Sequence, residues 1–172
     1  STHENPDGDG LGCAYAMHHI AKKMNIESKI ITATKFSKQY NFLNQDNCIE
    51  LYDYDIHYNW IKEADAAFIF DVGDFVRLRD VGRALTENKI YTFNIDHHPS
   101  LENSSFNENY VDTAAAATGE MIYEFIKKNE INFTKDEAIG VYTAIMTDTG
   151  SFRHSNTNSN CHKIAMECIE LG

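Results

Sequence analysis

Several features are scarce in the 172-residue sequence, and each shortage excludes a class of protein. No apolar run comes near the ~20 residues that a membrane-spanning helix needs. No basic segment followed by an apolar one indicates an export signal. The four cysteines are scattered and lack C-x-x-C spacing, which argues against a zinc site or a disulfide framework and favours reduced thiols. We therefore expect a cytoplasmic protein that does not contact membranes.

Basic residues are also scarce. Lys and Arg number 15 against 26 Asp and Glu, which gives a net charge of −11. Long duplex nucleic acid is bound through a basic surface, so we do not expect it as a partner. A small anionic substrate remains compatible, because divalent cations held by clustered carboxylates invert the local potential. The length and the 42% apolar content are typical of one globular domain.

The sequence has only two prolines, Pro6 and Pro99, and both lie in polar turns rich in Asp and His. An apolar run over residues 89–95 predicts a short buried strand, which ends at an Asp-His-His sequence before Pro99. In an open parallel sheet, ligands bind beyond the carboxyl ends of the strands. One carboxylate and two imidazoles suit divalent metals and phosphate oxygens, although the same residues alone are compatible with hydrogen-bonded structural histidines.

The turn around Pro6 leads into a helix for which Asp9 is a plausible N-cap. His3, Asp7 and Asp9 could point into a common pocket from this turn, and the neighbouring glycines would let the main chain approach a ligand. The alternative is a polar or calcium-like loop, although the acidic pattern of an EF-hand is missing.

The remaining pattern alternates strands and helices. Residues 66–70 form a second continuous apolar run that ends at Asp71, and a helical segment over 75–86 separates it from the strand at 89–95, which is the βαβ unit of a parallel sheet. A short strand is expected over 28–31, and residues 34–65 give no clear pattern. Further helices are expected over residues 113–129, 134–146 and 158–172. We predict an α/β fold with an open, mainly parallel β-sheet flanked by helices on both faces.

Four segments thus place acids or imidazoles at the ends of regular elements: His3, Asp7 and Asp9; Asp71; His97 and His98; and Asp148. Two divalent ions need about this many ligands if one carboxylate bridges them, and Mn²⁺ suits a mixed carboxylate and imidazole set. Two metals roughly 4 Å apart are the usual device for in-line displacement at phosphorus.

In their order and spacing, residues 3–9 (HENPDGD), 71–74 (DVGD) and 96–98 (DHH), together with Asp148, resemble motifs I to IV of the DHH phosphoesterase family. Residues 96–100, 111–120 and 150–157 most resemble its nanoRNase/pAp phosphatase branch, which includes exonucleases of very short RNAs. The resemblance implies a Rossmann-like DHH catalytic domain over residues 1–172. It also implies a fragment that lacks the family's first strand and its C-terminal substrate-binding domain.

The resemblance assigns roles residue by residue. His3, Asp7 and Asp71 would hold one Mn²⁺, and a second ion would bind the set that follows: Asp9, Asp71, His97 and Asp148. The assignment of Asp148 stays open, since it could contact either ion. Asp71 would then be the bridging, catalytic carboxylate.

Other positions would act on the substrate or on the ligands. His98 would face the scissile phosphate as electrophile or proton donor, and Asp96 would orient a histidine from behind. Arg153 and His154 are candidates for contact with substrate phosphate, whereas Arg77 is expected to be a salt-bridged helix residue.

The implied function is hydrolysis of short oligoribonucleotides, 3′-phosphoadenosine 5′-phosphate (pAp), or linear or cyclic dinucleotides. A hydroxide activated by two Mn²⁺ ions would attack phosphorus, with Mg²⁺ or Co²⁺ as substitute metals. The alternatives are an inorganic pyrophosphatase or polyphosphatase with the same metal site, and a nucleotide-binding module without catalysis. A small nucleotide or a short single-stranded RNA is the expected partner, and the sequence leaves a homodimer open.

Overall fold

The computed structural model describes residues 1–99 and 105–172; Ser100, the last residue of the 96–100 segment, lies outside these residues. The elements in chain order are α1 (Gly8–Lys23), β1 (Ile30–Thr32), the 3₁₀ helix η1 (Lys38–Asn44), β2 (Ile49–Leu51), α2 (Tyr54–Lys62), β3 (Ala66–Phe70), the 3₁₀ helix η2 (Phe75–Leu78), α3 (Arg79–Glu87), β4 (Tyr91–Asp96), β5 (Glu108–Val111), α4 (Thr118–Lys128), α5 (Lys135–Asp148) and α6 (Ser159–Leu171). None of the described helices is long and apolar enough to cross a membrane.

The strands pair in parallel wherever the structure describes them. β4 lies between β3 and β5, and β1 pairs with β2. The α/β class with parallel strands is therefore confirmed, but the described strands form two sheets where one open sheet was expected. At the edge of β3 away from β4, the main chain of Thr2 makes a parallel bridge to Phe70.

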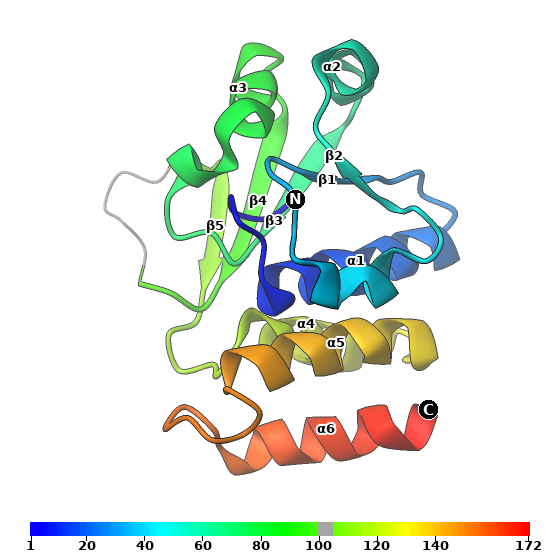
Figure 1. The fold of residues 1–172 in the computed structure, drawn as a ribbon, viewed down its shortest axis with the longest axis vertical. Coiled ribbons are helices and arrows are strands. Elements are labelled where there is room, and N and C mark those ends of the chain that lie inside the picture. The colour runs from blue at the N-terminus through cyan, green and yellow to red at the C-terminus, as the bar shows by residue number, and fades with distance from the viewer. Residues whose placement is uncertain (100–104) are drawn as a thin grey trace.

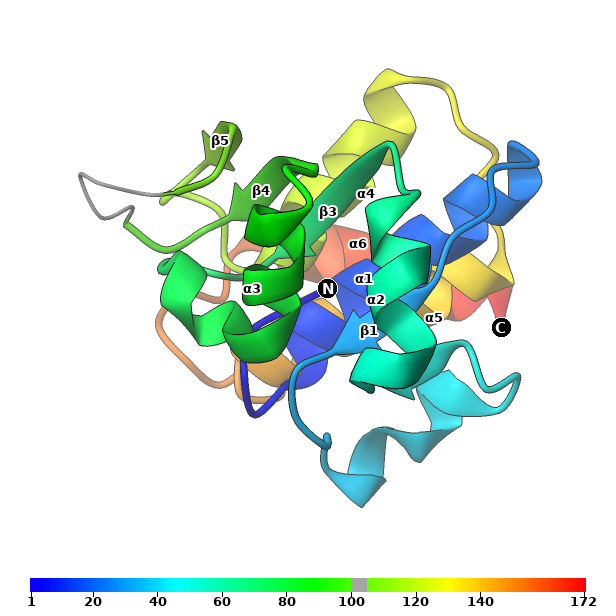
Figure 2. The ribbon, with the colours of Figure 1, turned by 90° about the horizontal axis from the view of Figure 1, so that it is seen from above.

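Side chains alternate along β3 and divide the core in two. Phe70 packs with apolar residues of α1, α4, α5 and α6, whereas Ile69 points to the opposite face and packs with Val81 and Leu85 of α3. Figure 1 shows α1, α4, α5 and α6 stacked below the sheet, and Figure 2 shows α2 and α3 on the side nearest the viewer. Helices thus cover both faces, as the sequence predicted.

The helices α1 and α5 cross with their main chains in contact. A methyl group at Gly12 would collide with the carbonyl oxygen of Gly140, and one at Gly140 would collide with the carbonyl oxygen of Gly12. Ala16 and Ala144 line the same crossing. Because the helices run in opposite directions, the start of α1 meets the end of α5 at one place beside the sheet.

Two helix starts differ from the prediction. Asp7, and not Asp9, is the N-cap of α1, because Asp7 Oδ1 accepts hydrogen bonds from the N–H groups of Asp9 and Gly10 at 3.1 Å each. The helix expected from residue 113 begins only at Thr118. The delay has a local cause, since Asp112 accepts hydrogen bonds from the N–H groups of the next residues and turns the chain before the helix.

Candidate metal centre

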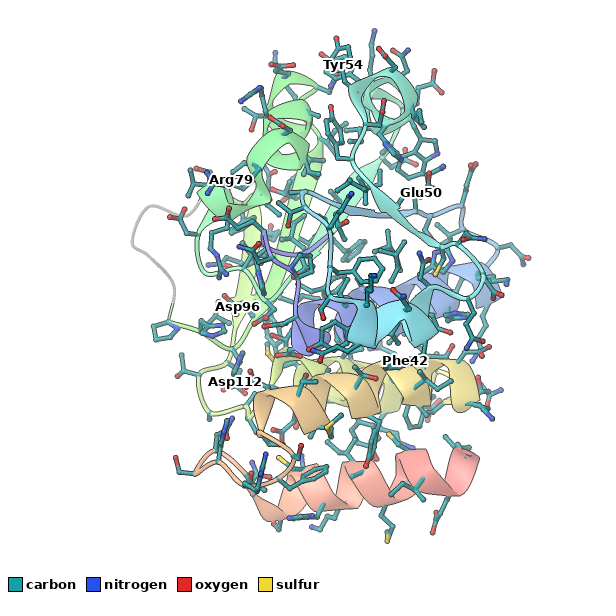
Figure 3. All side chains as sticks on the ribbon, viewed as in Figure 1. Phe42, Glu50, Tyr54, Arg79, Asp96 and Asp112 are labelled. Atoms are coloured by element: carbon teal, nitrogen blue, oxygen red, sulfur yellow. The ribbon has the colours of Figure 1, made fainter. Side chains whose placement is uncertain are left out.

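The ends of two strands and two helices converge on one cluster of acids and histidines. Asp71 follows β3, and His97 and His98 follow β4. Asp9 lies in the first turn of α1, and Asp148 is the last residue of α5. Figure 3 shows Asp96 and Asp112 at the end of the sheet where β4 and β5 stop. Side chains from distant parts of the sequence therefore meet at the carboxyl edge of the sheet.

His3 is the centre of one ligand group. Its Nε2 lies 3.4 Å from Asp7 Oδ2 and 3.5 Å from Asp71 Oδ2. Its Nδ1 is 2.6 Å from the carbonyl oxygen of Glu4, to which it donates a proton. That hydrogen bond fixes the ring and leaves the Nε2 lone pair facing the two carboxylates, as in a metal-ligating histidine.

His97 is the centre of a second group. Its Nε2 lies 3.7 Å from Asp9 Oδ2, 3.7 Å from Asp71 Oδ1 and 3.6 Å from Asp148 Oδ2. Its Nδ1 is 3.3 Å from the carbonyl oxygen of Ala115, the natural acceptor for the other ring proton. Asp71 thus belongs to both groups and offers one oxygen to each. This grouping is the one that the family resemblance implied for two ions.

The donor set fits divalent cations. His97 Nε2 is buried and makes no hydrogen bond among the described residues, a costly state for an atom that a cation would satisfy, and the buried Asp71 Oδ1 faces only an ion-pair contact with His98 Nδ1 at 3.2 Å. Both belong to sets of three potential ligand atoms lying within 4.8 Å of one another. The four carboxylates of Asp7, Asp9, Asp71 and Asp148 carry four negative charges when ionised, which two divalent ions would balance.

The electrostatic field of the cluster is strongly negative. Burial by itself would lower the pKa of His3, but the carboxylates of Asp7 and Asp71 outweigh it and raise that pKa to about 10. Burial raises the pKa of Asp9 well above its usual value, and the neighbouring charge of Asp71 raises it further. Such mutual repulsion among buried carboxylates is relieved by a cation, which is the property expected of a metal centre.

Asp71 has an unusual main-chain conformation, with φ of 61°. This left-handed region is uncommon for residues other than glycine, although Asp and Asn adopt it more readily than most. The backbone N–H of Asp71 donates to the carbonyl oxygen of Ile95 at 3.0 Å, which ties the turn to β4. Strain of this kind persists where the surrounding structure enforces it, often at functional sites.

His98 is held from behind by Asp96. Asp96 is fully buried, and its Oδ1 accepts hydrogen bonds from the His98 backbone N–H at 3.0 Å and from His98 Nδ1 at 2.9 Å. The His98 side chain is 51% exposed. The carboxylates of Asp71 and Asp96 raise the pKa of His98 to about 10 against the effect of burial, so the ring holds a proton that it can donate.

The three remaining predicted residues lie outside this cluster. Arg153 is exposed and donates from Nε to the carbonyl oxygen of Gly150 at 2.9 Å. His154 is also exposed, and its ring fills the space beside Gly150. Arg77 was expected to form a salt bridge, but it pairs with no acidic residue in the described part of the chain. Its carbonyl oxygen instead accepts a hydrogen bond from the Glu4 N–H at 2.8 Å, so Arg77 supports the first turn through its main chain.

Sequence reasoning assigned no role to Glu120 or Asn156. Asn156 Nδ2 lies 3.3 Å from Asp148 Oδ2, and the buried Glu120 Oε2 accepts a hydrogen bond from the Ala116 N–H at 2.8 Å. A glutamate three residues into a helix that begins with Thr-Gly was the available signal, because an acid at this position often caps the preceding turn. Asn156, in a polar loop, gave no pattern of its own.

The chain is similar to a known family and to several known proteins. The family model described as "DHH family, N-terminal domain" matches residues 1–145. A probable bifunctional oligoribonuclease and PAP phosphatase of Streptococcus mutans is 28% identical over 169 residues, covering 98% of this chain and 50% of the relative. A probable manganese-dependent inorganic pyrophosphatase of Streptococcus equi is 22% identical over 178 residues, covering 98% of this chain and 53% of the relative.

Among solved structures, an exopolyphosphatase-related protein from Bacteroides fragilis superposes with a TM-score of 0.91 at 23% identity, over 99% of this chain and 51% of that chain. This likeness concerns the fold. The chain spans about half the length of the relatives that it matches.

Proposed function

The chain belongs to the DHH family, and from this premise we propose that it is a phosphoesterase acting on short oligoribonucleotides, pAp, or linear or cyclic dinucleotides with two Mn²⁺ ions. One observation carries the proposal: Asp71 directs one oxygen toward His3 and the other toward His97. The name of the Streptococcus mutans relative supports oligoribonucleotides and pAp as substrates. Residues 1–172 would form the catalytic domain.

The chain's own residues would divide the work of the reaction. His3, Asp7 and Asp71 would hold one ion, and the other would bind to the second group: Asp9, Asp71, His97 and Asp148. Divalent ions bound there would supply Lewis-acid chemistry, lowering the pKa of water and neutralising charge on the phosphate.

Substrate contact would fall to the exposed residues of the site. His98 would donate a hydrogen bond or a proton to the phosphate from Nε2, because Asp71 and Asp96 raise the pKa of the ring to about 10 and so keep both of its nitrogens protonated. Arg153 and His154 follow Asp148 on an exposed loop and are the candidates for a further phosphate contact. The small, wholly anionic substrates proposed here would be attracted by the ions, since the chain itself carries a net charge of −11.

Mn²⁺ is proposed ahead of Mg²⁺ and Co²⁺ for two reasons. The donor set mixes imidazole nitrogen with carboxylate oxygen, whereas Mg²⁺ prefers oxygen alone. The name of the Streptococcus equi relative also supports manganese. That name favours inorganic pyrophosphate as the second candidate substrate, since the same ions and carboxylates could serve either ester or anhydride hydrolysis.

The test compares three substrates under identical conditions: pAp, a 5′-labelled RNA dimer and pyrophosphate. Ion content is measured first, by elemental analysis after equilibration with Mn²⁺ and desalting. The proteins are this chain and a version extended with its native flanking sequence.

We expect about two ions per chain and Mn²⁺-dependent release of phosphate or mononucleotide from pAp and the dimer, with the extended version faster. If pyrophosphate were hydrolysed faster than pAp and the dimer, the second candidate function, an inorganic pyrophosphatase, would be favoured. Absence of bound Mn²⁺ from both proteins would contradict the two-ion centre.

A further inference from the structure

One short main-chain segment contacts the ligands of the His97 group. The carbonyl oxygen of Ala115 lies 3.3 Å from His97 Nδ1. The N–H groups of Thr118 and Gly119 donate to Asp9 Oδ2 at 2.7 Å and to Asp9 Oδ1 at 2.9 Å. Asp9 therefore caps α4 from another helix while its carboxylate faces His97. Residues 115–119 thus fix two of the four side chains of this group, Asp9 and His97.

The third side chain, Asp148, is joined to the same segment by Asn156. The Asn156 Nδ2 lies 2.9 Å from the carbonyl oxygen of Ala116 and 3.3 Å from Asp148 Oδ2, and it is also 3.3 Å from the Asp148 carbonyl oxygen. One amide thus bridges the segment and the carboxylate. A tight turn after α5 places Asn156 beside Asp148. In this turn Gly150, Ser151 and Phe152 have φ values of 57°, 61° and 62°. Two of these are non-glycine residues in the left-handed region, which indicates a turn enforced by its surroundings.

The segment is itself held in place. Glu120 is buried, and its Oε2 accepts a hydrogen bond from the Ala116 N–H at 2.8 Å. Its Oε1 accepts one from Asn160 Nδ2 of α6 at 2.6 Å. Ala116 is therefore bonded on its N–H side by Glu120 and on its carbonyl side by Asn156. Within residues 1–99 and 105–172, none of these bonds reaches His3 or Asp7.

We propose that Asn156 is a positioning residue for the His97 group, setting the Asp148 carboxylate against the main chain that already holds Asp9 and His97. Asp148 ends a helix with its side chain 26% exposed, so without this amide it would sample other rotamers. The cost of ordering the Asp148 side chain would then weaken ion binding at the His97 group and leave the His3 group unaffected. The inference rests on the proposed function, because it requires the group to hold a divalent ion.

The test isolates each group before Asn156 is changed. His3→Ala leaves the His97 group as the intact site, and His97→Ala leaves the His3 group. Mn²⁺ binding to the full chain is titrated by calorimetry, with the electron paramagnetic resonance signal of free Mn²⁺ as an independent readout. Asn156→Ala is then added to each background. Asn156 is exposed, so we expect the variant to fold.

Asn156→Ala should weaken Mn²⁺ binding in the His3→Ala background by about 10–100-fold, the usual effect of removing a group that orients a metal ligand. In the His97→Ala background it should change the affinity less than twofold. The matched control is Asn158→Ala, because Asn158 lies in the same loop but caps α6 by accepting from the N–H groups of Asn160 and Cys161. This control should lower the melting temperature and leave both affinities unchanged.

Two results would overturn the inference. Unchanged affinity in the His3→Ala background would show that Asn156 does not position Asp148, and equal losses in both backgrounds would show a general structural role. Failure of the proposed function is distinguishable, because the chain without any substitution would then bind no Mn²⁺. Glu120→Ala and Glu120→Gln add a second measurement. Gln can still accept from the Ala116 N–H, and its NH2 group can donate to Asn160 once the Asn160 amide turns over, so Gln should retain the affinity that Ala loses.

Discussion

The two ligand groups of the candidate centre are supported by different kinds of structure. Asp9, His97 and Asp148 are each bonded, directly or through Asn156, to residues 115–119 and the start of α4. His3 and Asp7 come from one short turn near the amino terminus, and the Asp7 side chain is 50% exposed. Asp7 Oδ1 is also engaged as the N-cap of α1, which leaves Oδ2 facing His3.

The difference indicates a rigid group and an adjustable one that share Asp71. A ligand set already held by main-chain bonds loses little conformational freedom when an ion binds, whereas the half-exposed side chain of Asp7 must be ordered at that moment. We therefore expect the His97 group to bind its ion first and the His3 group to fill at higher Mn²⁺ concentration. Three substitutions test this comparison.

The largest effect is expected from Asp71→Asn, which removes the carboxylate shared by both groups. Asn adopts a left-handed φ as readily as Asp, so the turn at φ 61° should persist. Hydrolysis of pAp should fall about 1,000-fold, because several kcal/mol of charge stabilisation are lost. Asp74→Asn is the control: Asp74 accepts from the Val76 N–H at 3.1 Å, which Asn can also do. A fully active Asp71→Asn enzyme would refute a shared carboxylate.

A smaller effect is expected from Gly140→Ala, which acts on the support of the rigid group. The added methyl would meet the main-chain carbonyl of Gly12, so α1 and α5 must separate and carry Asp9 and Asp148 apart. Urea unfolding should show a loss of about 1–3 kcal/mol, together with weaker Mn²⁺ binding in the His3→Ala background. At Gly73, the nearest atom to an added methyl is 3.7 Å away, so Gly73→Ala should change stability little. Equal stability of Gly140→Ala and Gly73→Ala would show that α1 and α5 can move apart at little cost, contrary to this prediction.

The smallest effect on stability is expected from Asp7→Asn. Asn caps helices as well as Asp, so the free energy of unfolding should change by less than about 0.5 kcal/mol. The charge facing His3 is nevertheless removed, and Mn²⁺ binding in the His97→Ala background should weaken about tenfold, about 1.4 kcal/mol. Asp53→Asn is matched, since Asp53 caps α2 by accepting from Asp55 and Ile56. If Asp7→Asn also weakened ion binding at the His97 group, the two groups would not be supported independently, which would contradict the comparison.

The elements that the sequence located well are those with a continuous apolar run or a regular helical pattern. The apolar run over 66–70 coincides with β3, and the helix expected over 134–146 is α5, whose start carries a capping box of Thr134 and Glu137. Residues 34–65 gave no pattern because their elements are short: β2 has three residues, too few to show alternation, and η1 and α2 have seven and nine. β5 was missed because it is an exposed edge strand without an apolar face.

For the candidate site, the sequence supplied residue types and the family resemblance supplied their grouping. The structure brings His3, Asp7 and Asp71 together, and likewise Asp9, His97 and Asp148 with Asp71. What could not be predicted is the support behind them. Thr118 and Gly119 hold Asp9 through their backbone N–H groups, which every residue but proline has. A pattern of side chains contains no record of such contacts.

The anchoring of Asp9 by backbone N–H groups has a consequence for how this chain tolerates mutation. An anchor made by a side chain disappears with one nucleotide change, whereas the N–H of residue 118 survives every replacement except proline. Gly119 is restricted for another reason, since a methyl there would collide with Ala144 Cβ. Thr118 is itself fully buried, so saturation mutagenesis should find Asp9 held through the changes at position 118 that fit this space, with both positions restricted by lack of space and not by loss of the bond.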